Sequence, residues 1–120
     1  NILFVYFDKI IQNDNLYVKS LCEEIRRQNG SVECSIDAFW NSPRKYDIVH
    51  IQFPEVIFKW RQPSDNGLKA LRQRIARLKS MGTKIVYPRH DAIPHYCTDK
   101  NKLELYRIVE TQSNAIIHLG

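Results

Sequence analysis

The chain is predicted to fold as an α/β domain, a single Rossmann-like, doubly wound parallel sheet of about five strands with helices on both faces. Short runs rich in β-branched and aromatic residues alternate with longer segments of helical periodicity. Such alternation implies βαβ units with right-handed crossovers, for which we expect the strand order 3-2-1-4-5. The length of 120 residues suits one domain, spanning 1–120, around one core.

The first half of the chain contains three expected strands. Residues 2–7 are a continuous apolar run, which is typical of a strand buried on both faces. A helix follows, with apolar residues at helical spacing, and ends at Asn29-Gly30. Residues 32–36 and 47–52 are the second and third strands. Residues 37–46, which contain Asn41-Ser42-Pro43, are expected to form a loop.

The second half begins with an apolar run after Pro54 that fits either a short helix or a loop. A helix is expected over residues 65–80, where one apolar stripe repeats, and Met81-Gly82 closes it. Residues 83–87 are the fourth strand. A last helix, capped by Thr98 or Asp99, leads to a fifth strand over residues 115–119. The stripe of the helix over 65–80 consists of Leu68, Leu71, Ile75 and Leu78.

The charge of the chain is unevenly distributed. From Lys59 to Arg89 there are nine Lys and Arg against one acid, a net +8, so the remainder carries −3 of the total of +5. The basic face of the helix over 65–80 is either a solvated surface or a site of attraction to an anionic membrane surface. Nucleic-acid binding ranks third, because no recognition module accompanies the charge, and no nucleic acid is expected as a partner. The five cations of this face are Lys69, Arg72, Arg74, Arg77 and Lys79.

The remaining bulk features point to a cytoplasmic protein. No run approaches the length of a membrane span, and no secretory signal is recognisable. Cys22, Cys34 and Cys97 have no Cys-x-x-Cys spacing, and a reduced compartment is the default. We expect Cys22 and Cys34 to be buried thiols. Because the sequence starts directly in a strand and stops directly after one, we also expect it to be part of a longer protein.

Two segments combine a strand with a polar, His-bearing loop, at residues 47–55 and 84–95. Parallel-sheet proteins bind their ligands where the carboxyl ends of strands meet such loops, so a site is expected at this rim. His50 is either a hydrogen-bonded structural residue or a substrate ligand. Glu55 could hold a sugar hydroxyl, or it could simply offset the basic stretch.

The loop after the fourth strand is the densest in polar groups. His90 follows the strand directly, where a rigidly placed imidazole can donate and accept protons. Arg89, Asp91 and His95 lie beside it in the sequence. A zinc site formed by His90, His95 and Cys97 would need a spacing that matches no zinc pattern, so no metal is expected.

The loop after the first strand, residues 8–15, contains no glycine. Classical NAD binding is therefore not expected, since side chains keep a pyrophosphate away from the backbone. The start of the following helix can still offer N–H groups to an anion. Asn13, Asn15 and Tyr17 would add donors there, or the asparagines would only cap the helix.

Taken together, these segments resemble the amino-terminal domain of a GT-B-fold glycosyltransferase of the bacterial group related to family 4. Such domains typically have Asp-x-Val-His-x-His-Trp-Pro-Glu at the third strand, where this chain has Asp-Ile-Val-His-Ile-Gln-Phe-Pro-Glu over residues 47–55. The Pro-Arg-His-Asp-Ala-Ile-Pro-His of residues 88–95 is similar to the family's Thr-x-His-Asn-x-x-Pro-His. Asn15-Leu16-Tyr17 resembles the Asn-Pro-Tyr that opens the first helix. Gln52, Phe53 and Asp91 depart from the pattern.

The resemblance implies a two-domain enzyme, with a carboxyl-terminal domain outside this chain, that moves a hexosyl group from a nucleotide-sugar donor to a polysaccharide or lipid-linked acceptor with retention. It implies no cofactor and no metal, a place at the inner membrane face, and an inactive amino-terminal half when isolated. His90 would be catalytic. The expected substrate-binding residues are Asn13, Asn15, Tyr17, His50, Glu55, Arg89, Asp91 and His95.

Two other classes of function stay open on the sequence. One is a non-enzymatic, flavodoxin-like binding module. A signalling receiver fits poorly, because Asp8 stands alone after the first strand and the third strand ends in Gln52-Phe53-Pro54 without a phosphorylatable Asp. The other is a basic protein that binds nucleic acid or a membrane surface through residues 59–89.

Overall fold

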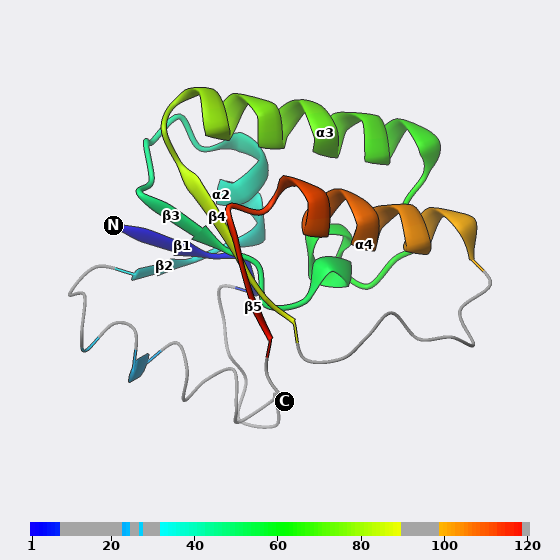
Figure 1. The fold of residues 1–120 in the computed structure, drawn as a ribbon. Helices are drawn as coiled ribbons and strands as arrows, with labels where there is room; N and C mark the ends of the chain where they lie inside the picture. The colour runs from blue at the N-terminus through cyan, green and yellow to red at the C-terminus, as the bar shows by residue number, and fades with distance from the viewer. Residues whose placement is uncertain (8–22, 25–26, 28–31, 90–98, 119–120) are drawn as a thin grey trace.

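The computed structural model of the chain describes residues 1–7, 23–24, 27, 32–89 and 99–118. Five parallel strands form one sheet in the order β2-β1-β3-β4-β5 (Figure 1). The predicted α/β class with a five-stranded parallel sheet is thereby confirmed. The strands are β1 Ile2–Phe4, β2 Val32–Cys34, β3 Ile48–His50, β4 Lys84–Arg89 and β5 Ala115–His118.

The expected strand order 3-2-1-4-5 is wrong, because β3 lies between β1 and β4. Ile2 is in register with Val32 on one side and with Ile48 on the other. Burial explains the arrangement: β1 is buried throughout, whereas all three residues of β2 are half-buried and one of them is Glu33. A short, partly polar strand suits an edge. The direction of the chain therefore reverses between β1 and β3, and the switch point lies there.

Within residues 32–89 and 99–118, four helical segments follow the strands: α2 Ile36–Asn41, the 3₁₀ helix η1 Pro54–Phe58, α3 Asp65–Ser80 and α4 Lys100–Gln112. Hydrogen bonds join α3 to α2 and to α4, and the three α-helices cover one face of the sheet (Figure 1). Right-handed crossovers explain this, because every connection from β2 onward moves in the same direction across the sheet. The helix expected on the other face lies mostly outside the described residues.

The loop expected over residues 37–46 is wrong in its first half, where α2 forms. Ser35 has extended backbone angles, and its Oγ accepts a hydrogen bond of 2.9 Å from the backbone N–H of Ala38. This is the N-cap arrangement that satisfies a free donor of a first helical turn. Ile36, Ala38 and Phe39 are buried, so the helix is fixed by packing despite its six residues.

The two long helices agree with the sequence expectation. α3 spans residues 65–80 as predicted, its four stripe residues are all buried, and Ser64 caps its first turn. Gly82 has φ +88°, a left-handed conformation that ends the helix and that glycine adopts without strain. Asp99 caps α4 by accepting from the N–H groups of Asn101 and Lys102. The apolar run after Pro54 forms the 3₁₀ helix η1, one of the two expected alternatives.

Candidate functional site

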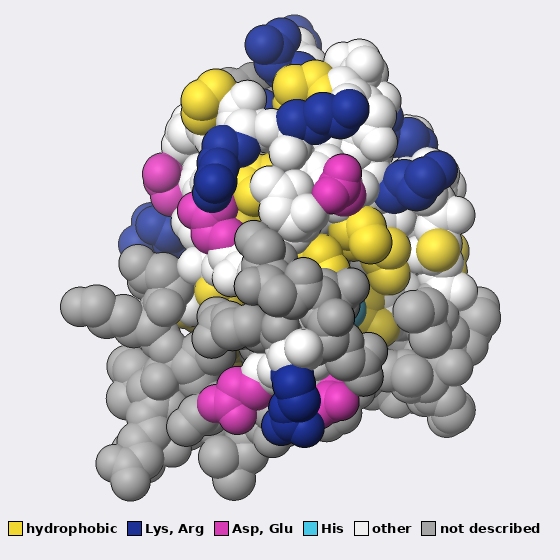
Figure 2. Space-filling model, turned by 90° about the vertical axis from the view of Figure 1, so that its left-hand side faces the viewer, with side chains coloured by type: hydrophobic (Ala, Val, Ile, Leu, Met, Phe, Trp, Pro, Cys, Tyr) yellow, Lys and Arg dark blue, Asp and Glu magenta, His cyan; other side chains and the backbone are white. Residues whose placement is uncertain are grey.

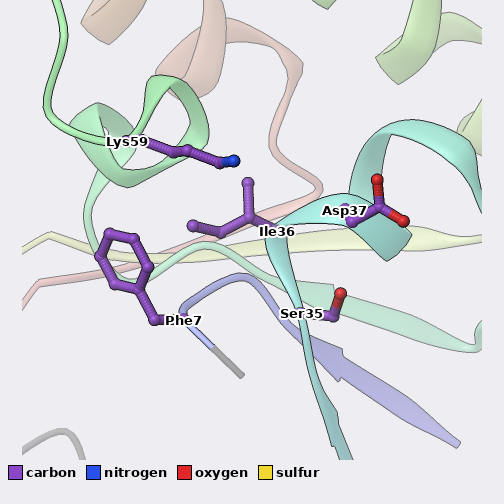
Figure 3. A pocket seen from close by; sticks show the side chains of 5 residues that line it. All are labelled: Phe7, Ser35, Ile36, Asp37 and Lys59. Carbon is purple, nitrogen blue, oxygen red and sulfur yellow. The ribbon is translucent and has the colours of Figure 1, made fainter. Parts of the chain in front are cut away.

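A hollow of about 190 Å³ lies at the carboxyl ends of β1 and β2, close to the switch point. Figure 3 shows its walls: one is the start of α2, and the other is the turn that follows η1. We call it the rim hollow. It combines an aromatic ring, a hydroxyl, a carboxylate and an ammonium group within one small space. Its lining residues are Phe7, Ser35, Ile36, Asp37 and Lys59.

The α2 wall of the rim hollow is rigid because its polar groups are bound within the helix. The Ser35 hydroxyl caps the helix, as described above. Asn41 donates a hydrogen bond of 2.9 Å from Nδ2 to Oδ1 of Asp37, one helical turn earlier. Asp37 therefore keeps a defined position while its side chain stays exposed. A carboxylate has several lone-pair sites, so one such bond leaves it able to accept further ones.

The opposite wall is formed by Lys59, whose side chain reaches across the hollow toward Ile36 (Figure 3). Lys59 has φ 55° and ψ 42°, and the next residue, Trp60, has φ 65°. Non-glycine residues adopt such left-handed conformations at a cost, so two in succession are unusual. The backbone N–H groups of Lys59 and Trp60 donate to carbonyl groups of the preceding η1 turn, which holds both residues in place.

The η1 turn itself is anchored to the core. Val56 and Ile57 are buried, and the indole Nε1 of Trp40 in α2 donates to the carbonyl oxygen of Ile57 at 3.1 Å. The ring of Phe58 packs edge-on against Trp40, with centroids 5.7 Å apart. At the start of α3, a Cβ on Gly67 would come within 3.0 Å of Phe58, so the absence of a side chain permits this approach. The strained turn thus follows a segment that is held by buried side chains and by the hydrogen bond from Trp40.

His50 was expected either as a structural residue or as a substrate ligand, and in the structure it is built into the sheet. It is 9% exposed, and its ring stacks on that of Phe4 in the neighbouring strand, with centroids 4.6 Å apart and planes inclined by 13°. Its Nε2 lies 2.8 Å from Oε1 of the buried Gln52. These contacts favour the structural role of His50, and a contact with substrate stays a prediction.

Glu55 lies in the first turn of η1 and is half-buried. Within the described part of the chain, its carboxylate makes no recorded hydrogen bond or ion pair. Arg89 ends β4, next to β3, but its side chain lies outside the description. The structure shows that the strands carrying the two His-bearing segments, β3 and β4, are neighbours, whereas the expected order 3-2-1-4-5 separates them. The other predicted site residues lie outside the described residues, and these are Asn13, Asn15, Tyr17, His90, Asp91 and His95.

The basic face of α3 is largely engaged in packing. The guanidinium of Arg74 donates to the carbonyl oxygens of Phe39 at 2.5 Å and Ser42 at 2.8 Å, and burial lowers the pKa of Arg74. Arg72 forms an ion pair of 2.7 Å with Glu104. Lys79 donates to the carbonyl of Gln112 at the end of α4. Three of the five cations thus join α3 to its neighbours.

The surface charge near α3 is mixed rather than continuous. In Figure 2, Lys and Arg side chains gather toward the top of the face, where α3 lies, while Asp and Glu side chains lie among and below them. Of the five cations, Lys69 and Arg77 have exposed side chains that form no hydrogen bond or ion pair with the described residues. Attraction to an anionic membrane through this helix stays a prediction that rests on these two cations. Across the described residues, no helix is both long and apolar enough to cross a membrane.

Sequence reasoning missed the rim hollow, because Ser35, Asp37 and Lys59 were not identified as site residues. The signal for the first two was present: a Ser followed by an acid in a first turn is a helix start, and a helix here places both at the strand ends. Lys59 was counted only as part of the basic stretch. Its left-handed backbone has no sequence signal, since Gly or Asn usually occupies such a position.

The described residues include no cluster of His, Cys, Asp and Glu that could hold a metal ion. Cys34 is half-buried in β2 rather than buried as expected, while Cys22 and Cys97 lie outside the described residues. No protein-family model matches the chain, and no curated protein or solved structure shows significant similarity to it.

Proposed function

We propose that this chain forms the amino-terminal, acceptor-binding half of a retaining glycosyltransferase. The intact enzyme transfers a hexosyl group from a nucleotide-sugar donor to a polysaccharide or lipid-linked acceptor. The donor nucleotide is assigned to a second domain, so the 120-residue chain alone is not expected to turn over. The proposal rests on the resemblance of two segments to the glycosyltransferase pattern and on their positions in the fold.

The observation that carries the proposal is the direct pairing of β3 with β4. Val49 is in register with Ile85, and His50 with Val86. The strands that begin the two segments resembling the family, β3 and β4, therefore end side by side at the same rim. In the proposal, His90 acts at the reacting centre, and its role depends on the resemblance because the residue lies outside the described part of the chain.

The chemistry of the rim hollow also supports a polyhydroxylated ligand. Sugar hydroxyls both donate and accept hydrogen bonds, so they suit a site that offers both a carboxylate acceptor and an ammonium donor. Asp37 and Lys59 supply these two groups on opposite walls of the hollow. Glu55 lies on the same η1 turn as Lys59 and adds a second carboxylate near this rim.

The test is nucleotide release by the complete gene product from a panel of nucleotide sugars, with and without candidate acceptors. Lys59→Ala is expected to raise the KM for the acceptor while the KM for the donor stays unchanged, because the proposal gives this half of the enzyme to the acceptor. Lys69→Ala, which removes an exposed cation from α3, is the matched control. Equal effects of the two variants, or a change confined to the donor KM, would contradict this assignment.

A further inference from the structure

Trp60 is an exposed aromatic residue at the rim of the sheet. It is 51% exposed, more than the other exposed large hydrophobic side chain recorded in the described residues, Ile116 at 37%. It follows Lys59 directly, so the two Cα atoms lie about 3.8 Å apart. The backbone of Trp60 therefore adjoins a lining residue of the rim hollow, and about half of its side chain is open to solvent.

The backbone of Trp60 is strained as well. With φ 65° directly after the φ 55° of Lys59, it occupies the left-handed region where its Cβ crowds the following carbonyl oxygen. Such strain persists where the surrounding structure enforces it, and it gathers at functional sites. The buried η1 turn enforces it here: the N–H of Trp60 donates to the carbonyl of Glu55 at 3.0 Å. The strained backbone of Trp60 thus holds an indole that is exposed to solvent.

The indole is also supported from one side. The centroids of its ring and the ring of Phe53 lie 6.0 Å apart, and the two ring planes are inclined by 42°. Phe53 comes directly before η1, at the carboxyl end of β3, and is half-buried against the core. This contact restricts the indole, so a ligand that stacks on it meets a surface ordered in advance. Pre-ordered aromatic residues lose little entropy on binding.

We propose that Trp60 is a stacking platform for one sugar ring of the acceptor, next to the polar groups of the rim hollow. The C–H groups on one face of a pyranose are slightly positive and fit the negative face of an indole. The sugar's hydroxyl edge then meets groups such as Lys59 and Asp37. This inference rests on the proposed function, which supplies the saccharide acceptor, and it assigns the acceptor's sugar to a particular residue.

The two tryptophans of the chain allow a direct test. Trp40 and Trp60 give two indole N–H signals in a ¹H–¹⁵N spectrum, and Trp60→Phe assigns them. Methyl glycosides of the common hexoses and N-acetylhexosamines are titrated into the labelled protein. A saturable shift of the Trp60 signal is expected with at least one glycoside. The Trp40 signal should not move, because its N–H is bound to Ile57 inside the fold.

Variants then separate stacking from folding. Binding to the Trp60 variants is followed through backbone amide shifts, because these variants lack the Trp60 indole signal. Trp60→Ala should weaken binding of the responding glycoside by about tenfold, whereas Ile116→Ala, the exposed apolar control on β5, should not weaken it. Trp60→Gly should weaken it as much while the melting temperature stays equal or rises, because glycine accepts the left-handed backbone. A response that survives in Trp60→Ala overturns the proposal. So does a Trp60 signal that moves only with a free nucleotide, or only with anionic phospholipid vesicles.

Failure of this inference is distinguishable from failure of the proposed function. If the complete enzyme releases nucleotide from a donor in an acceptor-dependent manner, but Trp60→Ala leaves the KM for the acceptor unchanged, the platform is wrong and the transferase stands. If glycosides move the Trp60 signal but no donor is ever turned over, the platform stands and the transferase reaction is wrong.

Discussion

His50 and Phe4 lie face to face across the β1–β3 pair, with ring centroids 4.6 Å apart and planes inclined by 13°. Phe4 is fully buried, and the two residues are also paired in the strand register. The stack therefore fixes the join between β1 and β3, which is the switch point of the sheet. The imidazole is part of the sheet's internal packing at the place where sequence reasoning had offered a substrate ligand as one alternative.

His50→Ala is expected to lower the free energy of unfolding by about 2–3 kcal/mol, because it removes the stacked ring and the contact of Gln52 Oε1 with His50 Nε2. Urea denaturation measures this change. Glu55→Gln, at a half-buried carboxylate, serves as the control and should stay within about 0.5 kcal/mol. Unchanged stability in His50→Ala would contradict the structural role of His50.

Arg74→Ala is expected to lower the free energy of unfolding by about 1–3 kcal/mol, since two backbone carbonyls at the end of α2 lose a charged donor. Arg74→Lys should restore only part of this, because an ammonium lacks the planar fork that reaches both oxygens. Arg77→Ala, three residues further along α3 and exposed, is the matched control and should be nearly neutral. Equal stability of Arg74→Ala and Arg77→Ala in urea would show that the cations of α3 are interchangeable.

Tyr46 makes the fold sensitive to alkaline pH. Burial, followed by its hydrogen bond to the carboxylate of Glu33, raises the pKa of the Tyr46 phenol above its ordinary value of 10.0. As the pH rises through about 10, the unfolded chain loses this proton before the folded one does. The contribution of the Tyr46 phenol to the free energy of unfolding is therefore complete below that pH and is lost above it.

Thermal melts between neutral pH and pH 11 measure this effect. Tyr46→Phe should lower the stability at neutral pH, because it removes the bond to Glu33, and should flatten the alkaline decline. If the melting temperatures of Tyr46→Phe and the unaltered protein fall in parallel as the pH rises, the alkaline sensitivity belongs to other groups.

Lys59→Gly is expected to raise the free energy of unfolding by about 1 kcal/mol, because glycine adopts φ 55° without the steric cost that a Cβ imposes. Lys69→Gly, in the interior of α3, should instead lower it by about 1 kcal/mol. The pair of variants, compared in urea, tests whether the turn after η1 is strained. A destabilised Lys59→Gly would mean that the lysine side chain contributes more to folding than the strain costs.

The sequence was sufficient for elements with strong periodicity. The stripe from Leu68 to Leu78 predicted α3 with its observed bounds, because four buried positions at helical spacing leave little choice. It was insufficient for α2, where Asn41-Ser42-Pro43 marks the end of a helix and was read as a loop. The strand order was predicted wrongly as well. The edge position of β2 depends on how deeply the strand is buried, and its three residues do not indicate this.

The rim hollow lies at the carboxyl edge of the sheet, where the sequence predicted a site, but none of its lining residues belongs to the predicted set. Pairing of β3 with β4 places the carboxyl ends of these two strands at one rim, while the position of His90 stays a prediction. The roles of Lys59 and Trp60 depend on a left-handed turn that is enforced by packing around Trp40 and Ile57. Contacts between residues so far apart in the sequence have no local signal, so single-residue patterns could not find them.

Acceptor-dependent nucleotide release by the complete gene product, with His90→Ala as the partner variant, tests the proposed transferase activity itself. We expect release from at least one nucleotide sugar and a loss of about 100-fold or more in His90→Ala, the scale of a lost proton-transfer group, with an unchanged melting temperature. Absence of release with every donor and acceptor, or full activity in His90→Ala, would contradict it.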